Sequence, residues 1–334
     1  MKIAVMGSGS VGTYVGGALI AAGADVVLIG RAPMQQRIAQ HGLVLTDLHQ
    51  TRIVLNAAQV PYRLEAQALA DADLILVTVK STATAQAAQD IAQWSRADAV
   101  ILSLQNGIGN AATLQRNLPR HTIVGGMVPF NIAQLDDGRL HRGTQGELMI
   151  APCAQLADWL PRFAAAGLPL NIRNDFEAVQ WGKLLLNLNN PLNALSGLPL
   201  KTQLSQRAWR RCLAQLIAEA LTILHGAGIK PAKVVSIAPH WLPTLLRLPD
   251  FLFRRIAASM LRIDPEARSS MAEDFDAGRR TEIDFLNGAV VVLALSLGRR
   301  APANQRIVEL VHAAEQGGAS TISGGAMWDD LRGR

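Results

Sequence analysis

The fold is decided at the start of the chain, by Lys2-Ile3-Ala4-Val5-Met6-Gly7-Ser8-Gly9-Ser10-Val11-Gly12. The first five residues predict a strand, and a Gly-x-Gly-x-x-Gly loop then opens a helical pattern. In this context Gly7 permits a tight turn, Gly9 lets a pyrophosphate approach the backbone, and Gly12 allows helix and strand to pack closely. We therefore expect the loop from Gly7 through Ser8, Ser10 and Val11 to Gly12 to bind a dinucleotide at the helix N-terminus. A glycine-rich turn without a ligand is the alternative.

The end of the second predicted strand indicates which dinucleotide is bound. Val26-Val27-Leu28-Ile29 is followed by Gly30-Arg31, without an acidic residue. A site for NAD has Asp or Glu here, because a carboxylate accepts a hydrogen bond from the ribose 2′-hydroxyl. Arg31 can instead hold a 2′-phosphate through two guanidinium N–H groups. We therefore expect NADPH/NADP+ as cofactor; a solvated surface arginine is the alternative.

The first half of the chain alternates short β-branched runs with helical patterns, which predicts a parallel sheet covered by helices. Strands are predicted at residues 2–6, 25–29, 73–79, 99–104 and 122–125. Helices are predicted at 11–22, 34–41, 82–94, 108–117 and 156–166. Further short strands, some of them antiparallel, are predicted at 43–46, 52–55, 139–141, 147–150 and 168–172. Residues 1–174 are thus expected to form an α/β Rossmann-type dinucleotide-binding domain.

After Asn174 strand signals nearly vanish and long apolar segments with helical spacing follow. The predicted helices are 176–194, 206–227, 232–246, 268–277, 281–297 and 304–316. Residues 175–316 are therefore expected to form an all-helical C-terminal domain that binds substrate. The pattern does not fix the helix breaks within 231–265. The Gly- and Ser-rich tail 317–334 is expected to be flexible.

Composition excludes several classes of protein. The chain has 334 residues, a net charge of +6, 49% hydrophobic and 17% charged residues, which fits two folded domains and excludes a disordered chain. Its arginine pairs are dispersed without interleaved aromatic residues, so we expect an anionic small-molecule partner and no nucleic acid. No apolar run reaches the ~18 residues that span a membrane. Cys153 and Cys212 form no Cys-x-x-Cys pair, which argues against a metal or disulfide framework and favours the reducing cytoplasm.

Two further strand ends carry polar residues at the edge where ligands bind in such sheets. The strand at 73–79 leads into Lys80, and the strand at 99–104 leads into Gln105-Asn106-Gly107. We expect Lys80 near the cofactor phosphate or ribose and Asn106 in the site. An exposed lysine and a simple Asn-Gly turn are the alternatives.

A polar stripe runs along an otherwise apolar helix in the second half. In Trp181-Gly182-Lys183-Leu184-Leu185-Leu186-Asn187-Leu188-Asn189-Asn190-Pro191, the side chains of Lys183, Asn187 and Asn190 stand at i, i+4 and i+7. Buried polar groups need partners, so the stripe indicates a polar cavity. Desolvation would lower the pKa of Lys183 toward a value useful for proton transfer. The alternative is a lysine that reaches solvent beside asparagines that cap neighbouring helices.

Two Ser/Thr-rich helix starts follow, at Ser269-Ser270-Met271-Ala272-Glu273-Asp274 and Thr281-Glu282-Ile283-Asp284. The pairs Ser270…Glu273 and Thr281…Asp284 have capping-box spacing. From the residues alone, Ser270 and Glu282 are equally well explained as helix-start residues and as site residues.

Taken together, these pieces resemble the ketopantoate reductase (2-dehydropantoate 2-reductase) family over residues 1 to about 316. The resemblance rests on the order and separation of the glycine loop, Arg31, Val79-Lys80, Gln105-Asn106-Gly107, the Trp181–Asn187 stretch and the two segments at 269–284. It implies a Rossmann domain and a helical domain with the active site in the cleft between them. It also implies reduction of ketopantoate by NADPH to D-pantoate, for pantothenate and coenzyme A synthesis.

The resemblance assigns roles residue by residue. Lys183 would be the general acid, and Glu282 would bind the substrate hydroxyl or orient the lysine. Asn106, Asn187 and Ser270 would hold substrate. The family often has a second asparagine eight residues after the lysine, whereas Asn190 comes at seven, so Asn189 and Asn193 are its possible substitutes. No metal is needed.

Two other functions remain open at this point, a reductase of another branched 2-keto acid and a non-catalytic NADP-binding sensor. The pairing of Lys183 with Glu282 argues against a sensor. A homodimer is possible.

Overall fold

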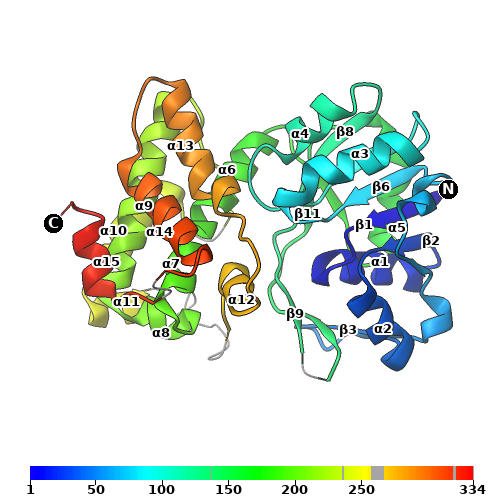
Figure 1. Cartoon of the computed structure of the whole chain (residues 1–334), viewed down its shortest axis with the longest axis horizontal. Coiled ribbons are helices and arrows are strands. Elements are labelled where there is room, and N and C mark those ends of the chain that lie inside the picture. Colours follow the sequence, from blue (N-terminus) through cyan, green and yellow to red (C-terminus); the bar gives the residue numbers. More distant parts are fainter. Residues whose placement is uncertain (136, 235–236, 257–266, 319–320, 334) are drawn as a thin grey trace. The chain divides into compact units, whose positions relative to one another are not determined.

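The computed structural model describes residues 1–135, 137–234, 237–256, 267–318 and 321–333. The chain divides into two compact units, Met1–Phe176 and Glu177–Arg334 (Figure 1). The first is an α/β unit and the second, in its described part, is built from helices. The division falls two residues after the predicted boundary.

An eight-stranded sheet forms the centre of unit 1, in the order β12-β11-β8-β7-β6-β1-β2-β5. The strands are β1 (Lys2–Met6), β2 (Asp25–Ile29), β5 (Tyr62–Arg63), β6 (Leu74–Val77), β7 (Val100–Ser103), β8 (Thr122–Met127), β11 (Leu148–Ile150) and β12 (Leu170–Ile172). Every neighbouring pair is parallel except β11 with β8. The predicted parallel sheet is confirmed, and the carboxyl ends of β1, β2, β6 and β7 lie along one edge.

Helices cover both faces of this sheet. They are α1 (Ser10–Ala21), α2 (Ala32–His41), α3 (Thr84–Trp94), α4 (Asn110–Asn117) and α5 (Leu160–Ala165), with short 3₁₀ turns η1 (Ala57–Gln59), η2 (Ala66–Leu69), η3 (Ser81–Ala83) and η4 (Ala154–Trp159). A second sheet, in the order β4-β3-β10-β9, lies in the same unit. Its strands are β3 (Leu43–Asp47), β4 (Arg52–Leu55), β9 (Ile132–Gln134) and β10 (Leu140–Arg142), with β10 parallel to β3 and the other pairs antiparallel.

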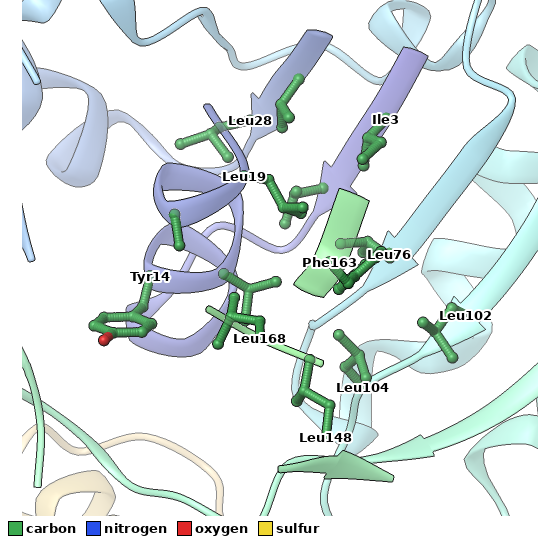
Figure 2. Close-up of a cluster of buried hydrophobic side chains, with 14 of the residues drawn as sticks. Ile3, Tyr14, Leu19, Leu28, Leu76, Leu102, Leu104, Leu148, Phe163 and Leu168 are labelled. Carbon is green, nitrogen blue, oxygen red and sulfur yellow. The ribbon is translucent and has the colours of Figure 1, made fainter. Parts of the chain in front are cut away.

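Strand alternation divides the core of unit 1 into two layers. Ile3, Leu28 and Leu76 point to one face, where Leu19 of α1 and Phe163 of α5 pack on them (Figure 2). The intervening strand residues point to the other face, against α3 and α4. Strands buried on both faces read as continuous apolar runs, which is why the sequence located them well.

Unit 2 is organised around one long helix, α9 (Arg207–Gly226), which contacts α8, α10, α13, α14 and α15. The other elements are α6 (Phe176–Asn187), α7 (Asn189–Ser196), α8 (Leu200–Ser205), η5 (Pro239–Trp241), α10 (Leu242–Arg247), α11 (Asp250–Ile256), α12 (Ser270–Asp276), η6 (Ile283–Phe285), α13 (Asn287–Ser296), α14 (Pro302–Glu315) and α15 (Gly324–Asp330). Within the described residues, no helix combines the length and the apolarity needed to cross a membrane.

Two helix predictions for unit 2, and the prediction for its tail, are wrong. The predicted helix 176–194 is two helices, α6 and α7, which divide at Leu188. The predicted helix 232–246 begins only near Pro239; residues 235–236 lie outside the described residues, and Ala232 instead donates its N–H to Ala178 O at 2.7 Å. The tail predicted to be flexible contains α15, whose Met327 is fully buried.

The segment 231–265, whose breaks the sequence left open, is fixed in its described part by Arg210. This side chain of α9 is fully buried. Its guanidinium donates to the carbonyls of Leu246 and Leu248 and, at 2.8 Å, to Asp250 Oδ1, so one residue ties α10 and α11 to α9. Residues 257–265 lie outside the described part.

Candidate functional site

The glycine loop between β1 and α1 has the geometry that a dinucleotide phosphate requires. Gly7 has a φ of +101°, and a Cβ atom there would lie 2.4 Å from Val79 N. At Gly12 a Cβ would lie 2.4 Å from Thr78 Oγ1. Gly9 is different, because it is exposed, has a φ of −78°, and has no other heavy atom closer than 4.0 Å to its Cβ position. Gly7 and Gly12 are thus needed by the fold, while Gly9 leaves open the space into which a phosphate fits.

The start of α1 also fits a bound phosphate. Its N-cap residue, Gly9, has no side chain to cap the helix, and the first turn holds no acidic residue. The first amides of a helix have no partners within it, so those of Ser10 and Val11 can receive a phosphate. Ser8 is buried and shapes the loop, since its hydroxyl donates to Val5 O at 3.3 Å and its carbonyl accepts from Thr13 Oγ1 at 3.0 Å. The residues present therefore fit a dinucleotide.

Arg31 lies directly after β2, exposed, as the N-cap residue of α2. The structure brings to it a second arginine that the sequence reasoning missed. Arg63 is in the two-residue strand β5, pairs in register with Ile29, and accepts Gly30 N–H on its carbonyl at 3.1 Å. The hydroxyl of Tyr62, its neighbour in β5, donates to Arg31 O at 3.2 Å. A strand of two residues has no periodicity to detect, so only the strand pairing reveals that Arg63 lies beside Arg31.

The loops after β6 and β7 are tied together by their side chains. The carbonyl of Asn106 accepts from Ser81 Oγ at 2.8 Å and from Asn110 Nδ2 at 2.7 Å. Buried Gln105 donates to Val79 O at 3.1 Å and to Thr84 Oγ1 at 2.7 Å. Lys80 and Asn106, both half-buried, thus stand on one rigid pair of loops at the carboxyl edge of the sheet.

Lys183 and Glu282 come together in unit 2. Lys183 is half-buried in α6, and Glu282 is half-buried just before η6. Burial lowers the pKa of Lys183 to about 8, and the nearby carboxylate of Glu282 opposes this shift by attraction. A lysine with this pKa holds its proton at neutral pH but gives it up far more readily than an exposed lysine.

The asparagines after Lys183 fall into two groups, those whose side chains bond to other buried protein groups and those whose side chains could bind a substrate. Asn189 and Gln203 exchange two amide hydrogen bonds, of 3.1 and 3.0 Å, and both are buried. Asn193 is fully buried and donates to Leu198 O while its Oδ1 accepts from Ser269 N. Half-buried Asn187 and Asn190 have no such side-chain bonds among the described residues, so Asn190 is better placed than Asn189 or Asn193 to meet a substrate.

The two predicted capping boxes do not form as the spacing suggested. Ser269, not Ser270, caps α12, by accepting Ala272 N–H at 3.2 Å. Ser270 is exposed at the first position of the helix. The N–H of Thr281 is bound by Glu315 at 2.8 Å, and Asp284 faces His312 instead. Ser270 therefore does not cap α12, and the side chain of Glu282, the residue directly before η6, makes no cap hydrogen bond.

The described residues hold no cluster of three or more His, Cys, Asp or Glu side chains placed to bind a metal ion. Both cysteines are free thiols, and burial raises the pKa of Cys212 to about 12, which makes it unreactive.

Comparison with known proteins agrees with this geometry. Residues 3–155 match the family model described as Ketopantoate reductase PanE/ApbA, and residues 175–315 match the model of its C-terminal part. The chain is 28% identical over 326 residues to a 2-dehydropantoate 2-reductase of Halobacterium salinarum, covering 95% of this chain and all of that one.

Solved structures show the same similarity. A PanE/ApbA family ketopantoate reductase from Ralstonia eutropha is 33% identical, with a TM-score of 0.79 and coverage of 95% of this chain and 99% of that one. A D-mandelate dehydrogenase in a ternary structure with NADH and anilino(oxo)acetate is 22% identical, with a TM-score of 0.76 and coverage of 95% and 99%, and shares the fold. Both halves of this chain match their family models, so it belongs to the ketopantoate reductase family and is an oxidoreductase.

Proposed function

We propose that this chain reduces 2-dehydropantoate (ketopantoate) to D-pantoate with NADPH, and so serves pantothenate and coenzyme A synthesis. The observation that carries the proposal is Lys183, a half-buried lysine with a pKa lowered to about 8 and a carboxylate, Glu282, beside it. Relatives of matching length that bear the name of this activity support it.

Each residue has a definite task in the proposed reaction. Bound NADPH would supply the hydride to the carbonyl carbon. Cationic Lys183 stabilises the negative charge that develops on the carbonyl oxygen and then donates its proton to it. Glu282 keeps that lysine protonated by attraction and accepts a hydrogen bond from a substrate hydroxyl. Amide and hydroxyl donors on Asn106, Asn187, Asn190 and Ser270 hold the substrate's polar groups.

The proposed preference for NADPH rests on charge at the end of β2. Arg31 and Arg63 are carried by adjacent strands at one sheet edge, and the N-terminus of α2 begins directly after Arg31 with no acidic residue in its first turn. Two guanidinium groups and a helix N-terminus favour a near-dianionic 2′-phosphate. Lys80 supplies a further cation after β6, two strands away in the same sheet.

The direct test is NADPH oxidation by the purified full chain with ketopantoate, with NADH as the matched cofactor. We expect turnover of ketopantoate, with a higher kcat/KM for NADPH than for NADH. Absence of turnover with ketopantoate would contradict the proposed substrate, and equal use of NADH would contradict the proposed cofactor preference.

A reductase of another branched 2-keto acid is the second candidate. It is favoured by the fold shared with D-mandelate dehydrogenase, whose name specifies a different 2-hydroxy acid. An assay of a series of 2-keto acids with NADPH distinguishes the two candidate functions. The 2-keto acid with the highest kcat/KM has the side chain that fits the pocket best. Cofactor binding without turnover of any keto acid would point to a non-catalytic sensor.

A further inference from the structure

The segment that carries Glu282 is held on both sides by one helix, α14. On the N-terminal side, Glu315 Oε1 accepts the N–H of Thr281 at 2.8 Å. On the C-terminal side, His312 Nε2 lies 2.9 Å from Asp284 Oδ1. His312 and Glu315 stand one turn apart on α14, with His312 Nδ1 3.5 Å from Glu315 Oε2.

The segment is also fixed within itself. The hydroxyl of Thr281 accepts the N–H of Ile283 at 3.3 Å, which forms a turn across Glu282. Thr281 and Ile283 are 3% and 1% exposed, so both residues beside Glu282 are locked into the core. The backbone of Glu282 therefore has little freedom, so the point from which its side chain extends is fixed.

Helix α14 is itself anchored to α9, the central helix of unit 2. Glu219 of α9 accepts the first amides of α14, from Ala303 at 3.0 Å and from Asn304 at 2.8 Å. Asn304 is fully buried and also donates its side-chain amide to Glu219. A carboxylate at a helix N-terminus satisfies amides that otherwise lack partners, so this end of α14 is firmly held.

We propose that Glu315 and His312 are positioning residues that hold Glu282 against Lys183, through the Thr281 amide and the Asp284 carboxylate respectively. Glu315 has the larger part, because its side chain is 15% exposed and bonds a buried backbone amide, whereas the His312–Asp284 pair is 40% and 60% exposed and is weakened by solvent. This inference rests on the proposed function, in which Lys183 is the acid.

The consequence can be measured at Lys183. An opposite charge nearby favours the protonated form of a lysine, so a Glu282 that moves away lets the Lys183 pKa fall. The titratable groups of α14 that contact the Glu282 segment are His312 and Glu315, and Asp284 lies on the segment itself. Loss of the Glu315 contact should therefore shift the alkaline limb of kcat/KM to lower pH.

The experiment compares Glu315→Ala with Glu315→Gln in the full chain, using NADPH and ketopantoate. Glutamine retains an acceptor for the Thr281 amide, so the alkaline limb should move less in Glu315→Gln than in Glu315→Ala. The matched control is Glu309→Ala on the same helix, whose carboxylate contacts the exposed side chains of Gln305 and Arg306. It should leave the limb where it is in the wild type. His312→Asn should shift it less than Glu315→Ala.

A double variant separates positioning from stability. In a Glu282→Gln background, Glu315→Ala should cause no further shift of the limb, because the charge that it positions is absent. A lower Tm with an unmoved limb in Glu315→Ala, or the full shift in the Glu282→Gln background, would overturn the proposal.

The pKa of Lys183 can also be read without turnover, from the pH dependence of its acetylation by acetic anhydride, followed by mass spectrometry. A wild type that reduces no keto acid would contradict the proposed function, while the labelling would still show whether Glu315→Ala lowers the Lys183 pKa. If labelling detects no change in that pKa, the positioning role is overturned whatever the activity.

Discussion

The two units build their candidate site residues in different ways. In unit 1 the proposed phosphate-binding loop is six consecutive residues, Gly7 to Gly12, between a strand and a helix. In unit 2 Lys183 and Glu282 come from segments about a hundred residues apart, one on α6 and the other just before η6, and only the folded unit brings them together. Local geometry therefore defines the loop of unit 1, whereas long-range packing defines the Lys183–Glu282 pair of unit 2. Variants of the loop should change cofactor affinity, and variants of the pair should change kcat and its pH dependence.

The largest effect should come from removing the proposed acid. Lys183→Ala is expected to lower kcat by ~100-fold or more, the range for loss of a general acid, while NADPH binding stays nearly unchanged. Steady-state kinetics and cofactor titration check both. Lys201→Ala, an exposed lysine of α8 in the same unit, is the control and should keep wild-type turnover. Near-normal kcat in Lys183→Ala would remove Lys183 from the proposed mechanism.

The glycine loop should separate binding from folding. Gly9→Ala meets no protein atom within contact distance, so its Tm should stay close to wild type while its Cβ occupies phosphate space. Loss of one or more charge-assisted hydrogen bonds would weaken NADPH by ~10–100-fold. Gly12→Ala clashes with Thr78 Oγ1 and Gly7 O and should lower the Tm instead. Calorimetry with and without cofactor distinguishes them, and unchanged NADPH affinity in Gly9→Ala would contradict a phosphate site at this loop.

Cofactor choice should depend on both strand-end arginines. Arg31→Asp is expected to weaken NADPH by ~10-fold or more, because a charge-assisted hydrogen bond is lost and a repulsion is added. NADH should be little affected or improved, since the new carboxylate can meet the ribose hydroxyls. Arg63→Ala should weaken NADPH less than Arg31→Asp and leave NADH unchanged. Dissociation constants for the two cofactors provide the measurement; an unchanged preference in both variants would mean that other residues read the phosphate.

The smallest effect should be a change in pH dependence. Reduction needs protonated Lys183, so kcat/KM should fall as the pH rises through about 8. In Glu282→Gln the attraction that supports protonation is lost, so this limb should move to lower pH, with a combined loss of kcat and substrate affinity. A pH profile of both enzymes checks the direction. If Glu282→Gln changed only the Tm, its role would be structural.

The sequence predicts unit 1 more accurately than unit 2, because unit 1 depends more on local patterns and unit 2 more on contacts between distant segments. The central strands β1, β2, β6 and β7 of unit 1 are buried on both faces, so their apolar runs predicted them to within a few residues, whereas the short strands β5 and β9 were not predicted. The helices of unit 2 were located broadly, but the division at Leu188 and the unwound chain at Ala232 depend on contacts with distant segments. Ala232 O lies where a Cβ on Gly182 would stand, and no local pattern reveals this contact.

The sequence by itself determined the family, the glycine loop and the residues that we propose for the chemistry, because these depend on residue type and on short spacings. Tertiary structure alone decided which of them have partners. It engaged Asn189 and Asn193 in amide networks, whereas the side chain of Asn190 has no such bond to a described residue. It also made Ser269 the cap in place of Ser270, and it paired the strand of Arg63 with the one that leads to Arg31. Hydrogen bonds between segments far apart in the chain are satisfied only in the folded state, so local patterns carry no record of them.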